Sequence, residues 1–306
     1  MPAGVISTGT HPKLLWPGVH AIWGQVYSEH QKQYTDLFDQ LDSEMAYEQD
    51  VQVTGFGLAP VKTEGGAVSY DSEVQGIIQT YLHIPYALGY IVTYEERINN
   101  QYEQVGKNRA RANAFSINQT IENVAAFLYN NAFSSTYYTM GDGVAICSAS
   151  HVNATGGTYS NILNPAADLS EAALEDATIQ IMGTQNDRGL YISILPESLH
   201  VARNEFFNAQ RIMKSTLQSN TNSNNINVLK AVNAFPKGIK MNTYFTNPHA
   251  WFIRTNCPNG MQMFWREKPN FMQDNDFDTR NAKAFTYMYF SVGGTDPRSI
   301  FGSNGP

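Results

Sequence analysis

Hydrophobic positions recur at three- and four-residue steps along one long proline-free stretch, residues Tyr102–Phe133. This period predicts a single apolar stripe on an α-helix. At 1.5 Å per residue the helix would be about 48 Å long, far above the mean of about 11–12 residues. Its other face is polar, so we expect the helix to lie along a surface. The predicted apolar stripe consists of Val105, Ala112, Phe115, Ile121, Val124, Ala125, Leu128 and Ala132; the polar face carries Lys107, Arg109, Arg111, Asn113, Asn118, Gln119 and Asn123.

The hydrophobic period changes to two on the N-terminal side of this helix. Residues 51–58 and 68–82 alternate apolar with polar positions, and residues 60–66 between them are rich in turn formers, which predicts a long β-hairpin. A two-stranded hairpin is marginally stable by itself in water. We therefore expect it either to fold back on its own chain or to project onto a neighbouring subunit.

The segments that flank this hairpin have weaker patterns. Residues 1–48 contain three prolines and only a modest helical period, which predicts an arm that lies on another surface. Residues 90–96 predict a short strand that enters a capping box, with Thr93 as N-cap and Glu96 three residues later. The pair Asn99–Asn100 and then Gly106 predict a break before the long helix.

The second half of the chain alternates helical and extended patterns. Helices are predicted for Leu169–Gln180, with Ser170 as N-cap, and for residues 204–216, and a buried strand is predicted for residues 190–195. Further strands are expected at residues 240–245, 250–255, 261–267 and 284–292. Helices packed on a sheet, with β-strands on both sides in sequence, predict an α+β fold.

Composition narrows the class of function. Charged residues make up 15% of the chain, against a typical share of about 25%, while amide and aromatic residues are plentiful. Such a surface suits repeated protein contacts, and a secreted β-rich protein is the alternative. The net charge of −7 argues against nucleic-acid binding by counterion release. Two cysteines and no signal-like or 18-residue apolar segment predict a soluble cytosolic protein without a disulfide framework.

Motifs for catalysis or metal binding are absent or incomplete. The phosphate-binding, dinucleotide-binding, serine-hydrolase and zinc-protease signatures do not occur. Cys147 and His151 are four residues apart in a glycine- and serine-rich loop, but no third orienting group is evident. The acidic run Asp274–Asp278 lacks the glycine and the final glutamate of a calcium loop. We therefore expect no enzyme activity, no cofactor and no metal ion.

The order of these elements resembles the tailed-bacteriophage major capsid proteins of the Hong Kong 97 fold, closest to the Mu-like major head subunits. The segments AYEQDVQVTGFGLAP and EGGAVSYDSEVQG are similar to the family's extended loop, and LGYIVTYEERINNQYEQV resembles the segment that leads into its spine helix. DGVAICSASH resembles the loop after that helix, and NDFDT with DPRSIFGSNG resembles the last strand. Together these pieces cover almost the whole chain.

The resemblance implies a domain organisation and a set of contact residues. It implies an N-terminal arm at residues 1–48, an extended β-hairpin loop at 49–90, a peripheral domain with the spine helix at 91–139 and 241–306, and an axial α/β domain at 140–240. Residues expected at contacts between subunits are Phe56, Leu58, Pro60, Lys62, Glu64, Gly65, Gly66, Arg109 and Arg111. Some relatives link a loop lysine covalently to an asparagine, but no partner for Lys62 can be matched here.

The resemblance also implies a function. Hexamers and pentamers would tile an icosahedral shell around double-stranded DNA, without sequence-specific DNA binding and without a membrane. Scaffold, portal and decoration proteins are the implied partners, and assembly would occur in the bacterial cytoplasm. An encapsulin-like compartment shares the fold and is the alternative; a β-rich carbohydrate-active enzyme, suggested by 17 tyrosines and four tryptophans, is a further one.

Overall fold

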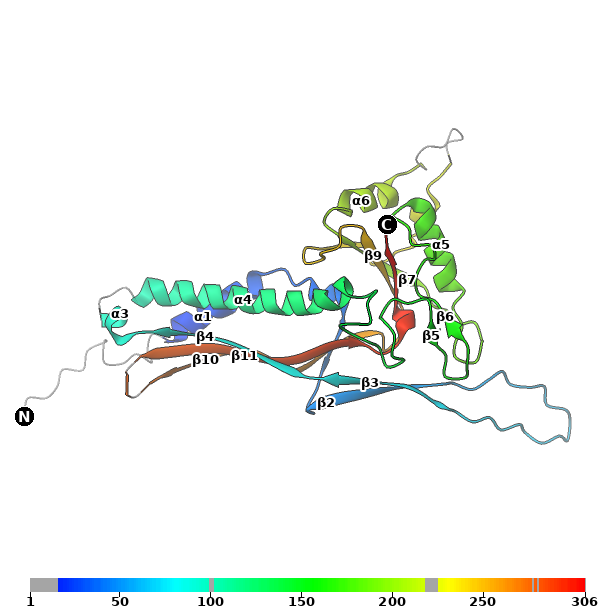
Figure 1. The fold of residues 1–306 in the computed structure, drawn as a ribbon, viewed down its shortest axis with the longest axis horizontal. Coiled ribbons are helices and arrows are strands. Elements are labelled where there is room, and N and C mark those ends of the chain that lie inside the picture. Colours follow the sequence, from blue (N-terminus) through cyan, green and yellow to red (C-terminus); the bar gives the residue numbers. More distant parts are fainter. Residues whose placement is uncertain (1–15, 99–101, 218–224, 277, 280, 306) are drawn as a thin grey trace, which may run out of the picture.

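The computed structural model describes residues 16–98, 102–217, 225–276, 278–279 and 281–305. Its helices and several sheets make an α+β fold, as predicted. Figure 1 shows three parts. An elongated body contains the sheet β1-β10-β11-β4 and helices α1 to α4; an α/β lobe contains the sheet β12-β9-β7-β8 and helices α5 to α7; and a projecting loop, residues 54–74, extends beyond the lobe.

The sheet of the elongated body is built on two long antiparallel strands, β10 and β11, flanked by β4 and the short parallel strand β1. Strand β10 extends well past the predicted residues 261–267, because register shifts around Pro269 interrupt its alternation without ending the pairing. Proline is tolerated there since β1 pairs only with residues 262–265, which leaves this part of β10 at an edge. The bounds are β1 Asp39–Asp42, β4 Ile84–Val92, β10 Met261–Asn275 and β11 Ala282–Gly294.

Helix α4, Tyr102–Asn130, lies along this sheet (Figure 1) and confirms the predicted long helix. Gly106 lies inside it and does not break it, while the predicted break at Asn99–Asn100 falls outside the described residues. The apolar stripe is only partly as predicted, because Ala112 and Phe115 are exposed. The buried stripe runs through Ala110, Ala114, Ile117, Ile121, Ala125 and Leu128.

The face of α4 that was expected to be exposed to solvent is also partly buried. Asn113 and Asn118 are buried: the Asn113 amide accepts a hydrogen bond from Trp23 Nε1 at 3.0 Å and donates to Leu88 O at 2.9 Å, and Asn118 donates to Tyr27 O. The helix therefore packs against both the sheet and the N-terminal segment beside it, so the prediction of a simple surface helix is wrong over this part. A buried amide that forms hydrogen bonds on both sides is stable in a core, which the polarity pattern could not reveal.

The described part of the predicted N-terminal arm packs on its own chain. Helix α1, Trp16–Glu29, lies against α4, and its Trp23 ring stacks on Phe271 of β10 at 5.5 Å. Helix α2, Tyr34–Leu37, then contributes Tyr34 and Leu37 to the main core. Residues 16–42 therefore cover the elongated body of the same subunit. The short helix α3, Tyr94–Ile98, begins after Thr93, whose Oγ1 accepts the Glu96 N–H at 3.3 Å as the capping box predicts.

The α/β lobe encloses a second core, made where α5 and α6 cover its sheet. Ser170 caps α5 by accepting the Ala173 N–H at 3.2 Å, and Gly183 ends it, as predicted. The predicted strand at residues 190–195 is wrong, because the strand is Pro196–Ala202. The sequence did not reveal this strand, because two of its buried residues are polar: Ser198 and His200 hydrogen-bond to each other at 2.9 Å. The bounds are α5 Glu171–Met182, β7 Pro196–Ala202, α6 Phe206–Lys214, α7 Val228–Ala231, β8 Ile239–Asn242, β9 Ala250–Thr255, η3 Pro297–Ser299 and β12 Ile300–Asn304.

Strand pairing bears on the domain division implied by the resemblance, which stays a prediction. Strands β9 and β12, within residues 241–306, belong to the sheet of the lobe, where β9 pairs with β7 on one side and with β12 on the other. The chain therefore enters the lobe twice more after residue 240. Residues 250–255 and 300–304 thus lie in the sheet of the lobe, and residues 84–92 lie in the sheet of the elongated body. The predicted domain boundaries stay a prediction.

Candidate assembly interface

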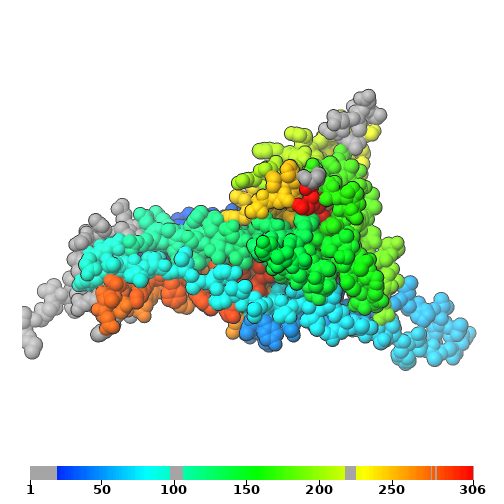
Figure 2. All heavy atoms as spheres, viewed as in Figure 1, coloured from blue at the N-terminus to red at the C-terminus, as the bar shows by residue number. Residues whose placement is uncertain are grey.

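The predicted β-hairpin is confirmed at its base and continues as a loop. Strands β2, Tyr47–Val53, and β3, Gln75–Leu82, form a two-stranded sheet. Beyond them the projecting loop has no strand pairing, although the alternation of its residues predicted one. Figures 1 and 2 show this loop extending past the α/β lobe, away from α4. A segment with no sheet of its own to join is available to another surface.

The projecting loop carries most of the predicted contact residues. Phe56, Leu58, Pro60, Lys62, Glu64 and Gly65 are all exposed, and Gly66 is half-buried. Leu58 is 80% exposed and the neighbouring Val61 and Tyr70 are 96% and 91% exposed. Its own chain therefore leaves the large apolar side chains of the loop uncovered, which marks an interaction surface.

The tip and the neck of the loop have defined backbone contacts. At the tip, Gly66 N–H donates to Thr63 O at 3.0 Å, and Gly65 has φ +72°, a conformation that favours glycine. At the neck, Thr54 N–H donates to Val74 O and Val74 N–H donates to Thr54 Oγ1. The loop is thus closed at both ends, with the apolar side chains between.

Asp71 joins the two arms of the loop near the neck. Its Oδ2 accepts the Gly57 N–H at 2.7 Å and its Oδ1 accepts the Ser72 N–H at 2.8 Å. Those two hydrogen bonds, with the guanidinium of Arg188, lower the pKa of Asp71 below its usual value. Arg188, from the turn after α5, makes the contact between loop and lobe. The sequence did not predict this contact, because no periodic pattern marks a turn residue that pairs with a distant loop.

The two basic residues predicted on the long helix lie far from the loop in sequence and differ in environment. Arg109 donates to Glu96 at 2.8 and 3.1 Å and to Ile91 O at 2.7 Å, so it ties α4 to α3 and the end of β4. Arg111 is exposed. Arg109 thus has a role inside the subunit, and the assembly role of both residues stays a prediction.

An apolar groove of about 580 Å³ lies where β3 and β4 meet α4 and β11. Leu82 and Phe127 at its mouth are 67% and 44% exposed. Phe127 lies on α4 at a position that the helical pattern does not mark, so the sequence did not reveal the groove. The lining includes Leu82, Ile84, Val124, Phe127, Tyr138 and Val292.

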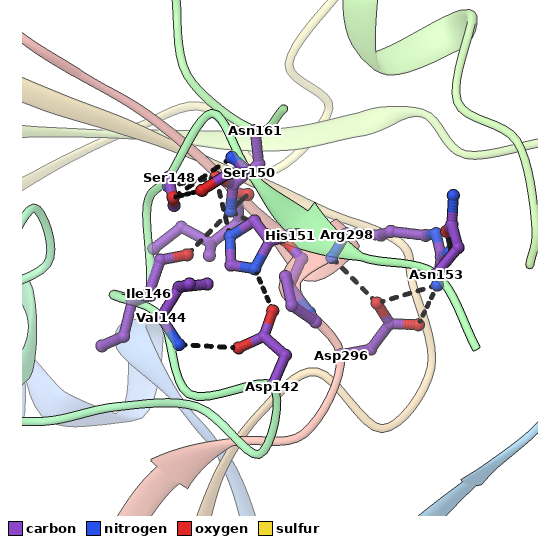
Figure 3. A network of polar contacts seen from close by, with 12 residues as sticks. Asp142, Val144, Ile146, Ser148, Ser150, His151, Asn153, Asn161, Asp296 and Arg298 are labelled. Carbon is purple, nitrogen blue, oxygen red and sulfur yellow. Dashed lines mark hydrogen bonds and ion pairs between the residues drawn. The ribbon is translucent and has the colours of Figure 1, made fainter. Parts of the chain in front are cut away.

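His151, one of the two residues considered for catalysis, belongs to a structural network instead (Figure 3). His151 Nδ1 lies 2.6 Å from Asp142 Oδ2, and His151 Nε2 lies 3.1 Å from Asn161 Oδ1, so both ring nitrogens are engaged. Cys147 lies against Gly302, and burial raises the pKa of its thiol. A buried neutral thiol whose candidate base is occupied elsewhere is a poor nucleophile.

One carboxylate of the acidic turn between β10 and β11 is paired within the chain. Lys283 Nζ lies 2.6 Å from Asp276 Oδ2, and this contact lowers the pKa of Asp276. Over residues 16–98, 102–217, 225–276, 278–279 and 281–305, no three His, Cys, Asp or Glu side chains gather closely enough to bind a metal ion. No described helix is long and apolar enough to cross a membrane.

Comparisons with known proteins place these features in context. A family model described as phage capsid protein matches residues 79–302. A comparison with curated protein sequences finds no match.

Several solved phage structures share the fold. The capsid of Myoviridae phage XM1 aligns with a TM-score of 0.52 at 10% identity, over 90% of this chain and 92% of that chain. Mycobacterium phage Che8 aligns with a TM-score of 0.51 at 11% identity, over 90% and 93%. The procapsid of bacteriophage JBD30 aligns with a TM-score of 0.51 at 13% identity, over 98% and 77%. At these identities the likeness concerns the fold.

Proposed function

The chain belongs to the phage capsid protein family and is a major capsid protein, and from this premise we propose that its copies form hexamers and pentamers that close into an icosahedral shell. The shell would enclose the double-stranded DNA of a tailed phage. The family consists of structural shell proteins, so the chain is not an enzyme. The closer resemblance to Mu-like head subunits stays a prediction.

The projecting loop is the observation that carries the proposal for assembly. It exposes Leu58, Val61 and Tyr70 almost fully, at a place where its own subunit offers no cover. Removal of apolar surface from water contributes about 25 cal/mol per Å², from which the costs of association and of ordering the loop are subtracted. Docking of this loop on a neighbouring subunit would therefore supply one contact of the shell, repeated at every subunit.

The apolar groove between α4 and the strands β3 and β4 is the acceptor that we propose for this loop. Each copy carries both surfaces, so the contact is between different patches on two copies, the arrangement that builds rings and closed assemblies. The loop of the same subunit points away from α4 (Figure 1), and none of residues 54–74 lines the groove. Many such contacts of modest strength add up to a stable shell.

The shell would retain the DNA by enclosing it. The net charge of −7 gives no general attraction for phosphate, so no sequence-specific contact is part of the proposal. Scaffold, portal and decoration proteins are the further partners proposed, with assembly in the bacterial cytoplasm and the mature protein in the virion capsid.

The two alternatives fit less well. An encapsulin-like compartment would enclose protein, but the matching family is that of phage capsid proteins. A carbohydrate-active enzyme is not supported, because shell proteins of this family are structural.

Imaging tests the proposed function. We expect the protein, expressed alone or with its neighbouring genes, to form closed particles in negative stain. Persistent monomers under both conditions would contradict the shell. Particles filled with a cargo protein and lacking nucleic acid would favour the encapsulin alternative.

A further inference from the structure

The turn after α5 is held in a fixed shape by its own side chains. Asn186 Oδ1 accepts the N–H groups of Arg188 at 3.0 Å and Leu190 at 2.9 Å, and Gly189 has φ +74°. Backbone hydrogen bonds also join Asn186 to Leu190 and to Gly189. The turn is therefore a stiff support for the two charged residues at its apex, Asp187 and Arg188.

Asp187 attaches this turn to the interior of the lobe. Its Oδ1 lies 2.8 Å from Arg298 Nη2, and the two side chains are 7% and 3% exposed. Arg298 Nε also donates to Gln185 O at 3.1 Å. Arg298 in turn belongs to the network of Figure 3, with Asn153 and Asp296. The turn thus moves with the lobe.

The adjacent residue, Arg188, reaches in the other direction to the projecting loop. Its Nη1 lies 3.3 and 3.4 Å from the Asp71 carboxylate, and its Nη2 donates to Ser72 O. Asp71 is also the residue that joins the two arms of the loop through Gly57. One arginine therefore connects the support on the lobe to the point where the loop is closed.

Beneath this connection the hairpin and the lobe are separated by a cleft of about 400 Å³. Strand β2 lines one side with Gln52 and Val53, and Asn186 and Asp296 lie on the other. The contact across it from the strand is a single long hydrogen bond, Gln52 Nε2 to Asp296 Oδ2 at 3.4 Å. Strand β3, the other strand of this ribbon, packs closely on the chain that follows α4, with Gly76 beside Ala154 and Ile77 beside Gly141. The ribbon is therefore held at its base, and the Arg188 connection acts on the loop beyond it.

We propose that Arg188 is a positioning residue that fixes the direction of the projecting loop relative to the α/β lobe. A loop that is already oriented loses less conformational freedom when it docks on another copy. The effect on loop order follows from the contacts within one subunit. The consequence for shell closure rests on the proposed function.

Three variants of the full chain test the Arg188 connection without disrupting the fold. Arg188→Gln removes the cation. Asp71→Asn keeps the acceptor for the Gly57 N–H and removes only the charge, in an exposed loop where it cannot unfold the lobe. The third carries both changes, and Arg203→Gln, an exposed arginine of the same lobe, is the matched control.

The first measurement is amide hydrogen exchange of residues 54–74 in the unassembled chain. We expect exchange about two- to fivefold faster in each single variant, the range for losing a partly exposed ion pair. The double variant should exchange no faster than Arg188→Gln, because that change alone removes both contacts of the guanidinium, to Asp71 and to Ser72 O. Unchanged exchange in both singles, or effects that add in the double variant, would overturn the proposal.

The second measurement is the rate of shell closure, followed by light scattering and checked by negative stain. Closure should slow in Arg188→Gln and Asp71→Asn and stay at the parental rate in Arg203→Gln. A loop that exchanges faster while shells close at the parental rate would show that its direction does not matter for assembly. If the parent chain forms no shell, the proposed function fails, and the exchange measurement still decides whether Arg188 orders the loop.

Discussion

Glu122 is a buried carboxyl on the long helix, 4% exposed, facing the start of α2. Burial raises its pKa to about 7 from an ordinary value of 4.5, although the Gln33 N–H that it accepts at 2.7 Å works against the rise. The folded chain therefore retains a proton that the unfolded chain releases between these two values. Stability from this group is fully present below pH 4.5 and is lost as the pH rises to about 7.

Replacing Glu122 by Gln should remove this pH dependence. The stability of Glu122→Gln relative to the parent should rise by roughly 1–2 kcal/mol between about pH 4.5 and pH 7.5, after allowance for solvent screening. Chemical denaturation of the unassembled chain at several pH values measures the difference. Glu95→Gln, an exposed carboxyl at α3, is the control and should follow the parent. Parallel pH curves for the parent and Glu122→Gln would show that Glu122 is not the titrating group.

Arg298 is the other residue on which local stability depends. Its side chain is 3% exposed, pairs with Asp187 and lies 4.5 Å from the centre of the Tyr159 ring. Replacing it with Met should cost about 3–5 kcal/mol, since Asp187 would remain buried without its partner. The double variant Arg298→Met with Asp187→Leu should recover part of that loss in a denaturation experiment. A single variant as stable as the parent would contradict this reading of the network.

At the scale of elements, the projecting loop should be separable from the fold. Deleting Ala59–Gly66 removes side chains that its own subunit does not bury, so the variant should keep the circular dichroism and the unfolding transition of the parent. It should also fail to close shells. Replacing Leu58 and Val61 by Ser keeps the loop length and tests whether the apolar side chains are what matters.

Two outcomes of this experiment would contradict a loop that is separable from the fold and needed for assembly. Global unfolding of the deletion variant would mean that the loop contributes to the core of its own subunit. Closed shells from both variants would mean that neither the loop nor its apolar side chains are needed.

The elements that the sequence predicted best have strong local signals. The long helix, the Ser170 cap and the strand at residues 250–255 follow directly from period and capping chemistry. Strand β7 was missed because a buried Ser198–His200 pair interrupts its apolar run. The cover over α4 was missed because Asn113 is polar, and only the tertiary structure shows its hydrogen bonds to Trp23 and Leu88.

The residues of the candidate interface also differ in how well the sequence predicts them. Exposure of the loop residues from Phe56 to Gly66 could be anticipated from turn formers between two alternating segments. The groove and the Arg188 connection could not, because each brings together residues far apart in the chain. The Arg188 side chain meets Asp71 across more than a hundred residues of sequence, a contact that no local pattern encodes.

At the scale of the whole molecule, each part has a distinct mechanical task. Helix α4 and the β10–β11 pair give the elongated body its length, and the lobe is joined to it by strands that return from the end of the chain. The loop then leaves on the far side of the lobe (Figure 1). An elongated subunit with uncovered apolar surfaces at separate places can contact several neighbours at once, which is what a closed shell requires.

Cryo-electron microscopy of particles formed by the purified full chain would show directly where the projecting loop docks. We expect closed icosahedral shells in which residues 54–74 of every subunit lie on a neighbouring subunit, with Leu58 and Val61 buried at that contact. Shells in which the loop remains exposed or folds onto its own subunit would contradict the proposed contact. A chain that stays monomeric at every concentration tested would contradict the shell itself.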